Sequence, residues 1–489
     1  MRRITRRALI GSGTLLGASV VAAACQPKEV VKIVKETVPV TVKETVTVKE
    51  TVQVEKVIKE VITPTPVASL DRLPYKANGK AKGKVRFWNC WGESRVRLMT
   101  DMIAGFHNLY PDVIVENLVL LCSDVTSKYA TAVAGGDPPE CVMMFSSDLP
   151  LFAGGGTLRA LDDLVTRDNV KPEEYYPAEW EARKYTDKLY LLPQVSALGK
   201  NMMLGNIKVM DEVGIKPPTT WQEMLEASKK CVKVTSGKVT RMGFLPMTHP
   251  QLPDPVFINW LLLNGGEWIS KDLTRMTFNS PEGLGALEFM LEASDINTDK
   301  RPQDILQTGE NEFFAIARNG FAQGNLAFTI HGSWLFQMLA ALGMEFKDYT
   351  VTRVPKNGAN PKATYGTGSE GGWGFGIPKL VKDPEPAWEW IKYSCYGPAS
   401  GAFTKAQTRP NPIKKYNEDP DLHKNPHWKT LLELMNEEKA YPATEAYPKQ
   451  RERIRDMCWN VIYHKETPKA ALEAAWKDCQ AELDKVRKK

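Results

Sequence analysis

The amino-acid sequence predicts an α/β protein that divides into two or more lobes. Its 489 residues are more than one ordinary hydrophobic core accommodates. A hydrophobic content of 43% and a charged content of 25% are typical of globular proteins. From Lys84 onward, short apolar runs alternate with amphipathic segments. This is the order of strands and helices in a parallel sheet covered by helices.

The first apolar run, Val85–Trp88, is expected to be a strand, and the loop after it carries Trp91 and Glu93. A helix with apolar residues at three-to-four spacing leads to the strand Val113–Val119, and a second helix leads to the strand Cys141–Phe145. Ligands of open α/β sheets bind outside the carboxyl ends of the strands. We therefore expect Trp91 and Glu93 to face a ligand, although packing of the strand–helix corner explains both residues as well.

The stretch Phe321–Trp334 contains a turn and then the apolar run Leu326–Ile330, which is expected to be another strand. The run stops abruptly at His331. Gly332 removes the side-chain bulk that would block a close approach to the backbone, and Trp334 stands at the end of the strand. The pattern suits a ligand-binding strand end, but an ordinary core strand explains Leu326–Ile330 equally well.

The N-terminus has the layout of an export signal, which we assign to residues 1–24. Met1–Arg7 is basic, Ala8–Ala24 is small and apolar, and Cys25 closes the run. The arginine pair in the basic segment resembles a twin-arginine signal, which carries folded proteins across a membrane. The Ala-Ala-Cys sequence resembles a bacterial lipobox, with Cys25 as the lipidated residue. The alternative is a retained membrane anchor, and in either case the bulk of the chain is expected outside the cytoplasm.

Residues 25–70 have the composition of an extended stalk. Valines recur at even positions from 38 to 54, among threonine, lysine and glutamate, and this period of two argues against a helix. The segment from 26 to 70 has no aromatic residue, so it cannot build a core. Two prolines in the sequence TPTP then form a stiff joint. Self-association of this β-rich segment into an oligomeric stem is the alternative.

Charge and motifs exclude several functions. The 64 basic and 58 acidic residues give a mild net charge of +6, so no nucleic-acid partner is expected. No CxxC pair indicates a zinc site, and the pairing of the cysteines, where one or two disulfides could form, stays open. The chain has no HExxH, GxSxG, SxxK or P-loop motif, and a strand rather than a helix is expected after the GxGxxG match at Gly366–Gly371. We therefore expect no metal and no cofactor.

Several segments, in the same order along the chain, resemble the extracellular solute-binding proteins that serve ABC importers, above all the maltose/oligosaccharide-binding family. They include FHNLYPDVIVE, TAVAGGDPPECVMM, GIKPPTTWQEML, FAQGNLAFTIHGSW and GGWGFGIPK. The resemblance runs from about Lys84 to the C-terminus. It implies an α/β protein with the two-lobed, type II periplasmic-binding-protein-like fold and a hinge between the lobes. The N-lobe would comprise residues 84–197 plus 353–398, and the C-lobe 198–352 plus 399–489.

Sugar sites combine flat aromatic faces, which cover the C–H face of a sugar ring, with short polar side chains for the hydroxyls. The resemblance puts Trp334 at a stacking position and polar ligand contacts after the strand that ends at Phe145. The candidate ligand-binding residues are Trp334, Ser333, Gly332, Trp373, Gly372, Glu370, Trp91, Glu93, Phe145, Ser146, Ser147, Asp148, Asp254 and Tyr447.

Each main candidate also has a structural interpretation. Asp148 could simply cap the following helix. Phe145, Trp334 and Trp373 could be core residues. Asp254 resembles an acid that binds hydroxyls in the family, but Val256 stands here where the family has an aromatic residue.

The expected function is that of a lipid-anchored receptor, not an enzyme. It would capture a carbohydrate outside the membrane and deliver it to the permease subunits of an ABC transporter. The alternatives are a receptor for another polar solute, such as a glycerol phosphodiester or a peptide, and a surface-anchored glycoside hydrolase or lyase, since a pair of catalytic carboxylates leaves no sequence signature. An excess of Arg or Lys at the site would favour a phosphate. A purely adhesive stalked protein is a weaker alternative.

Overall fold

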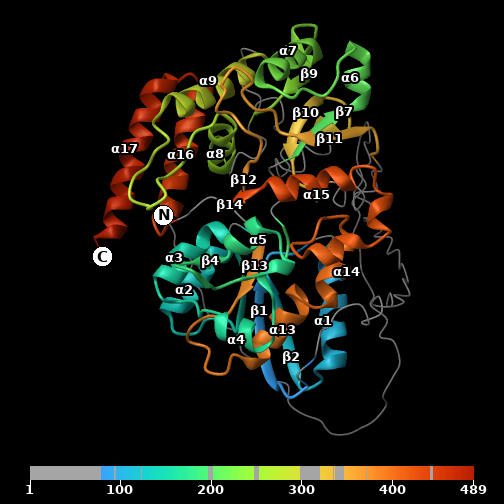
Figure 1. The fold of residues 1–489 in the computed structure, drawn as a ribbon, viewed down its shortest axis with the longest axis vertical. Coiled ribbons are helices and arrows are strands. Elements are labelled where there is room, and N and C mark those ends of the chain that lie inside the picture. Colours follow the sequence, from blue (N-terminus) through green and yellow to red (C-terminus); the bar gives the residue numbers. More distant parts are fainter. Residues whose placement is uncertain are drawn as a thin grey trace, which may run out of the picture. The chain divides into compact units, whose positions relative to one another are not determined.

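The computed structural model describes residues 77, 79–92, 95–122, 124–196, 202–246, 253–297, 320–333, 335, 346–369, 372–440 and 444–488 (Figure 1). Contacts divide the chain into Met1–Thr65 and Pro66–Lys489. The expected export signal, Cys25 and the stalk up to residue 70 all lie outside the described residues. The second unit contains two five-stranded sheets, each with its own hydrophobic core.

The first sheet has the strand order β2-β1-β3-β13-β6. Its strands are β1 (Gly83–Asn89), β2 (Val113–Val119), β3 (Cys141–Phe145), β6 (Leu192–Pro193) and β13 (Trp373–Gly376). β1 runs parallel to β2 and β3, whereas β13 runs antiparallel to β3 and β6. The three strands expected in this part of the sequence are therefore confirmed, and a returning antiparallel strand adds to them.

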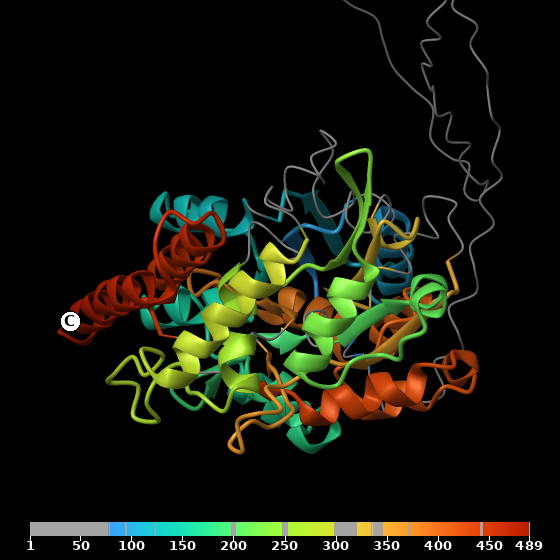
Figure 2. The same ribbon diagram turned by 90° about the horizontal axis from the view of Figure 1, so that it is seen from above.

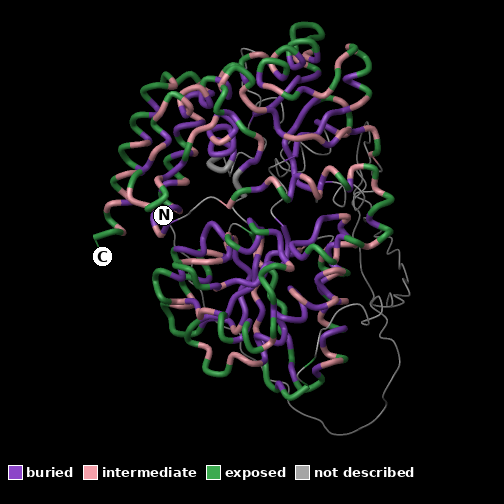
Figure 3. The backbone as a smooth tube through the Cα atoms, in the orientation of Figure 1, coloured by how far each residue is buried: buried purple, intermediate pink, exposed green. Residues whose placement is uncertain are grey.

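Helices cover this sheet because each presents an apolar stripe to it. Met99, Met102 and Phe106 are the buried side chains of the first helix, at the three-to-four spacing read from the sequence. The tube in Figure 3 shows the buried segments gathered on the strands and on the inner sides of the helices. The helices of this part are α1 (Val96–Leu109), α2 (Val125–Ala134), α3 (Leu149–Gly154), α4 (Asp162–Arg167), α5 (Pro177–Glu181), α13 (Glu385–Cys395) and α14 (Pro398–Ala406).

Two glycines allow β13 to lie close to the segment that enters β6. A Cβ added to Gly374 would lie 2.8 Å from Cβ of Leu191, and one added to Gly376 would lie 2.7 Å from Cδ2 of Leu191. Such approaches are too short for real side chains. The spacing of glycines in the GGWGFG segment thus permits close strand packing in the first core.

The second sheet has the strand order β11-β7-β10-β9-β8. Its central strand, β10 (Leu326–His331), is antiparallel to β7 (Met202–Asn206) and parallel to β9 (Lys238–Phe244). The strand expected at Leu326–Ile330 is confirmed, and every residue of it is buried. The outer strands are β11 (Tyr349–Arg353) and β8 (Lys233–Thr235). Two short pairs complete the described strands: β4 (Lys184–Tyr185) with β5 (Lys188–Leu189), and β12 (Gly368–Ser369) with β14 (Lys439–Ala440).

The helices of the second core follow from clear capping and packing signals. The hydroxyl of Thr220 accepts a hydrogen bond from the backbone N–H of Glu223, and the carboxylate of Glu223 accepts one from the backbone N–H of Thr220. The expected N-cap is therefore a complete capping box. α16 and α17, the red helices near the C-terminus in Figure 2, pack side by side. The helices are α6 (Ile207–Val213), α7 (Trp221–Cys231), α8 (Pro253–Leu263), α9 (Pro281–Asp295), α15 (Trp428–Glu437), α16 (Tyr447–Ile462) and α17 (Pro468–Arg487).

The first core extends further along the chain than residue 398. Ala399 and Phe403 of α14, and Ile413 after it, are buried in the first hydrophobic cluster together with the first sheet. The sequence-based division counted these residues with the C-lobe. The lobe boundaries themselves stay a prediction. None of the described helices combines the length and the apolar character that a membrane span requires.

Candidate functional site

One edge of the first sheet collects most of the described candidate residues. β1 and β3 end at this edge, β6 also ends there, and the antiparallel β13 begins there. We call it the carboxyl edge and define it by Asn89–Trp91, Phe145–Asp148, Pro193–Ser196 and Gly372–Trp373. Ligands of α/β sheets bind at edges of this kind.

An aromatic pair stands at the centre of the carboxyl edge. Trp373 is paired in register with Phe145, and the two rings stack with centroids 3.5 Å apart at an interplanar angle of 27°. Both residues are only partly buried. Each ring therefore covers one face of the other, and Trp373 can offer only its second face to a ligand.

The end of β3 supplies a buried polar turn. Ser146, Ser147 and Asp148 form a short 3₁₀ helix and are all at least 95% buried. Oδ2 of Asp148 accepts a hydrogen bond from Oγ1 of Thr126 at 2.7 Å, and its Oδ1 lies 3.5 Å from Nη2 of Arg451 on α16. Asp148 occupies the N-cap position of α3, but its side chain makes no cap hydrogen bond. The interpretation of this carboxylate as a simple helix cap is therefore wrong.

The serines of this turn differ in their partners. The hydroxyl of Ser146 donates to the carbonyl of Gly372 at 3.4 Å, and thereby links the ends of β3 and β13. The hydroxyl of Ser147 is buried and has no hydrogen-bond partner among the described residues. A buried hydroxyl without a partner costs free energy unless a ligand or water satisfies it.

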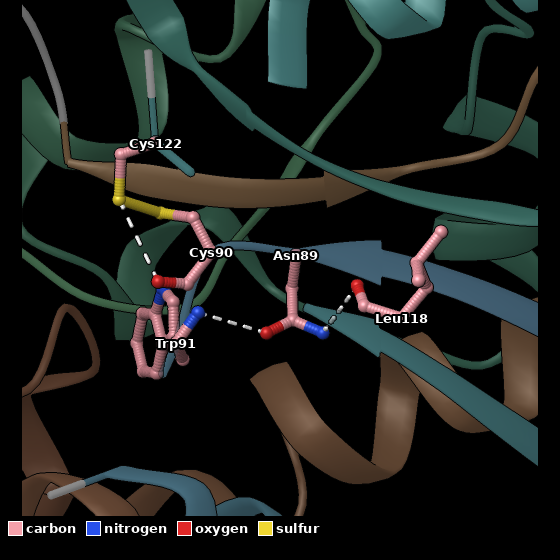
Figure 4. The surroundings of a disulfide bond; sticks show 5 residues. All are labelled: Asn89, Cys90, Trp91, Leu118 and Cys122. Carbon is pink, nitrogen blue, oxygen red and sulfur yellow. Dashed lines mark hydrogen bonds between the residues drawn. A yellow bond between two sulfur atoms is a disulfide. The ribbon is translucent and has the colours of Figure 1, made fainter. Parts of the chain in front are cut away.

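The end of β1 holds Trp91 in place by three kinds of contact. Its ring packs on Phe403 with centroids 4.2 Å apart, and the guanidinium of Arg95 lies 5.7 Å from the ring centroid. Its backbone N–H donates to the side chain of Asn89 at 2.9 Å (Figure 4). Trp91 is 1% exposed, and its indole N–H has no acceptor in the part of the chain that the structure describes.

A disulfide closes the loop next to Trp91. Cys90 bonds to Cys122, which follows β2, so the ends of β1 and β2 are covalently joined (Figure 4). The sequence left the pairing open. The five other described cysteines are buried and form no disulfide among the described residues.

Gln194 is a site residue that the sequence analysis missed. It follows β6, its backbone N–H donates to the carbonyl of Trp373 at 3.0 Å, and it is 0% exposed. Neither its amide oxygen nor its amide nitrogen has a hydrogen-bond partner within the described ranges. Ser196, two residues later, is also fully buried with an unpartnered hydroxyl. A single glutamine between a strand and a loop carries no motif, so only the fold reveals it.

Two buried arginines hold the backbone beside Gln194. Nη1 of Arg183 lies 2.7 Å from a carboxylate oxygen of Glu179, both side chains being 0% exposed, and its Nη2 donates to the carbonyl of Val195 at 3.1 Å. Arg409, 5% exposed, donates to the carbonyl of Ser196. These arginines were not anticipated either, because Arg409 is 213 residues from Ser196 in the sequence and Arg183, 12 residues from Val195, belongs to no motif.

The end of β10 is buried as well. The backbone N–H of Gly332 donates to Nδ1 of His331 at 2.8 Å. Burial lowers the pKa of His331 to about 4, against a weaker raising effect of the Gly332 carbonyl, which lies 3.3 Å from Nδ1. The imidazole is therefore neutral at pH 7. The hydroxyl of Ser333 is fully buried and unpartnered among residues with described placement, whereas Trp334 lies outside them.

Of the remaining candidates, only Tyr447 has a described side chain. Tyr447 is 0% exposed in the second core, where its ring meets Trp268 edge-on at 6.4 Å, so we do not carry it into the proposed site. Asp254 lies in α8, and its side chain is not described. Glu93 and Glu370 lie outside the described residues. No group of three or more His, Cys, Asp or Glu in the described ranges could hold a metal ion.

Comparison with known proteins accounts for this architecture. Residues 94–394 match the family of bacterial extracellular solute-binding proteins. The chain belongs to this family. Its relatives bind solutes and are not enzymes. A curated relative, a probable sugar-binding periplasmic protein of Rhizobium meliloti (strain 1021), is 24% identical over 261 residues, which are 52% of this chain and 57% of the relative. The match thus spans a little over half of that relative.

Solved structures of solute-binding proteins have the same fold. An ABC transporter solute-binding protein of Thermotoga lettingae, bound with α-D-tagatose, is 23% identical with a TM-score of 0.69, over 82% of this chain and 100% of that one. A maltose/maltodextrin-binding domain of Bdellovibrio bacteriovorus, bound to maltotriose, is 19% identical with a TM-score of 0.68, over 82% and 100%. This solute-binding protein therefore has the two-lobed type II fold, as the sequence predicted.

Proposed function

We propose that this protein captures a carbohydrate outside the cytoplasm and delivers it to the permease of an ABC transporter. The observation that carries this proposal is the Trp373–Phe145 pair, which stands beside buried polar groups without partners at the carboxyl edge. The open face of Trp373 suits the C–H face of a sugar ring. Gln194 and Ser147 then supply donors and acceptors for hydroxyl groups.

The physical argument concerns the free energy of these polar groups. A buried amide or hydroxyl without a hydrogen bond costs about 1–3 kcal/mol. Gln194, Ser147 and Ser196 would each gain their missing partners from a ligand rich in hydroxyls. An apolar ligand would leave them unsatisfied, and a purely structural role for Gln194 would be better served by an apolar residue of similar volume.

The relatives support the same ligand class. The curated relative is described as a probable sugar-binding protein, and the similar solved structures hold α-D-tagatose and maltotriose. Sequence identities of 19 to 24% do not transfer a particular sugar. We extend to this chain only the class of ligand, a saccharide.

Export and anchoring follow from the N-terminal sequence. We propose that residues 1–24 direct export through a twin-arginine signal, that Cys25 becomes the lipidated first residue, and that residues up to 70 form a stalk. The family is extracellular or periplasmic, which agrees with an exported receptor. Closure of the two lobes over the sugar would present the loaded form to the permease.

A ligand screen tests the function. The full chain is heated with a panel of mono- and oligosaccharides, polyols, a glycerol phosphodiester and short peptides, and the melting temperature is measured. We expect a saccharide to raise it at a saturable concentration. Analysis of the saccharide after incubation must recover it intact. A shift with the phosphodiester or a peptide alone would contradict a carbohydrate ligand, and turnover of the saccharide would contradict the receptor function.

A further inference from the structure

The Cys90–Cys122 disulfide joins a buried residue to an exposed one. Cys90, at the end of β1, is 7% exposed. Cys122, in contrast, is exposed on the loop after β2, and Leu121 directly before it is 70% exposed. The five other described cysteines are all buried. Among the described cysteines, Cys122 is therefore the residue that a reagent in solution can reach while the protein is folded.

The sheet itself brings the two cysteines together. β1 and β2 pair in parallel along their whole length, and the backbone N–H of Leu120 extends the pairing by donating to the carbonyl of Asn89 at 2.8 Å. The side-chain amide of Asn89 donates to the carbonyl of Leu118 as well (Figure 4). The Cα atoms of the two cysteines lie 4.9 Å apart, which is within the range that a disulfide spans without movement of the backbone. The reduced chain is therefore expected to fold with both thiols in place.

The proposed export route requires the bond to close after folding. A twin-arginine signal carries proteins that are already folded. The cytoplasm, where such a protein folds, keeps thiols reduced, whereas the space outside it is oxidising. The folded chain would thus leave the cytoplasm with Cys90 and Cys122 as thiols. Because thiol–disulfide exchange depends on access to the reacting sulfur, the exposure of Cys122 meets this requirement.

The bond also borders the ligand site. Cys90 belongs to the carboxyl edge and directly precedes Trp91, whose backbone N–H donates to the side chain of Asn89 and whose ring packs on Phe403. Without the disulfide, non-covalent contacts alone hold this strand end. With it, the backbone that enters Trp91 is tied to β2. A site that is held in its bound arrangement loses less conformational freedom on binding and therefore binds more tightly.

We propose that Cys122 is a thiol–disulfide exchange site, where a disulfide oxidant outside the cytoplasm closes the Cys90–Cys122 bond on the folded protein and thereby raises its affinity for the saccharide. The effect on affinity rests on the proposed function, and the order of events rests on the proposed export. The exchange at Cys122 depends on neither, because it follows from the exposure of this residue and from the register of the two strands.

Closure takes two exchange steps. The thiolate of Cys122 attacks one sulfur of the oxidant's disulfide, and the other sulfur of the oxidant leaves as a thiolate that takes up the proton lost by Cys122. The thiolate of Cys90 then attacks the Cys122 sulfur of this mixed disulfide. The second sulfur of the oxidant leaves and takes up the proton lost by Cys90. The two cysteines lose two electrons, and the oxidant, now a dithiol, gains them.

Reduction of the folded full chain tests the access to the bond. The purified oxidised protein is treated with dithiothreitol at several concentrations, with and without low urea, and the remaining Cys90–Cys122 peptide is quantified by mass spectrometry. We expect a rate of opening that is proportional to dithiothreitol and that changes less than about twofold between zero and about 1 M urea, because the folded protein reacts. A rate that rises steeply with urea, or that is independent of dithiothreitol, would show reaction only after unfolding and would overturn the proposal.

Matched single variants identify the reacting sulfur. Cys90→Ser and Cys122→Ser are treated with oxidised glutathione, and peptide mapping follows the adduct on the remaining cysteine separately from Cys25 and from the buried cysteines. We expect the adduct on Cys122 to form about tenfold or more faster than the adduct on Cys90. Equal rates, or faster reaction at Cys90, would remove Cys122 as the exchange site. The reduction kinetics of the parent protein need no variant, so they decide on access even if a variant folds poorly.

Calorimetric titration tests the effect of closure on binding. The probes are the saccharides that raise the melting temperature in the screen, beginning with glucose, galactose, mannose and their short oligomers. We expect dithiothreitol to weaken binding to the parent protein by about threefold or more, and oxidised glutathione to restore it. The control is the double variant Cys90→Ser/Cys122→Ser, whose affinity should not respond to either reagent.

The outcomes of this titration separate the proposals. Equal affinity of the oxidised and the reduced parent protein would overturn the effect of the bond on binding and leave the carbohydrate receptor standing. Failure of every saccharide to bind in both redox states would contradict the proposed function, and the effect on affinity with it. The exchange at Cys122 is measured without a saccharide and is decided by its own kinetics.

Discussion

Trp373 stacks on Phe145 across the neighbouring strands β13 and β3, with ring centroids 3.5 Å apart. The two residues are direct partners in the sheet register, so the backbone holds the rings together. The stack gives the two aromatic residues different roles in the proposed site. Trp373 would present a ring face to the sugar, and Phe145 would support that ring from behind.

Trp373→Ala should lower saccharide affinity by tenfold to a hundredfold, because it removes the ring face against which the sugar packs. Phe145→Leu should have a smaller effect, since it removes only the support of that ring. Calorimetric titration with a saccharide found in the screen measures both. Trp459→Ala is the control, because Trp459 of α16 is a partly buried residue that stacks on Tyr463, the residue after that helix. Unchanged affinity in Trp373→Ala would remove the aromatic pair from the site.

Trp334→Ala should abolish saccharide binding with little effect on folding. Trp334 follows the buried end of β10 in the sequence, and the family resemblance predicts a stacking aromatic residue at this position. The melting temperature without ligand should stay within a few degrees of the parent protein, whereas the ligand-induced shift disappears. A large loss of stability with retained affinity would instead make Trp334 a core residue.

Asp148 and Arg451 should be energetically coupled in ligand binding. The carboxylate is 98% buried, and the guanidinium, which comes from α16 of the second core, lies 3.5 Å from it. We expect Asp148→Asn and Arg451→Gln each to weaken ligand binding. The loss of binding free energy in the double variant should be about 1 kcal/mol smaller than the sum of the two single losses. Strict additivity in this double-mutant cycle would mean that the contact plays no part in the bound state.

The Cys90–Cys122 disulfide should stabilise the protein by about 2–4 kcal/mol, because it closes a loop with a sequence separation of 32 residues in the unfolded chain. Denaturant unfolding of the double variant Cys90→Ser/Cys122→Ser measures this difference. Since Cys90 precedes Trp91, saccharide affinity should fall as well. A reducing agent should reproduce both effects in the parent protein and change neither in the double variant, whose other described cysteines are buried and form no disulfide among the described residues.

His331 should make stability depend on pH. Burial lowers its pKa to about 4 from an ordinary value of 6.5, so the unfolded chain binds the proton more readily than the folded protein does. Its contribution is complete above about pH 6.5 and is lost as the pH falls toward 4, by roughly 3 kcal/mol. His331→Asn, which keeps an acceptor for Gly332, should flatten the unfolding free energy in this window. Parallel pH profiles of variant and parent would contradict the assignment.

The sequence by itself determined the secondary structure around the site. Val113–Val119, Cys141–Phe145 and Leu326–Ile330 are apolar runs of strand length, and Thr220 with Glu223 forms a local capping signal. These features depend on side chains a few residues apart, so a linear pattern records them. The family resemblance likewise depends on local segments in a fixed order, and the family match and the fold confirmed it.

Only the tertiary structure decided which side chains meet. The Cys90–Cys122 bond, the Trp373–Phe145 stack and the approach of Arg409 to Ser196 join residues that are 32, 228 and 213 positions apart. Gln194 shows the same limit, because an unpartnered amide can be recognised only when all its neighbours are known. Contacts over such separations depend on strand order and on helix packing, which residue periodicity does not encode. The sequence predicted where the strands end, and the fold assembled the polar and aromatic groups at those ends.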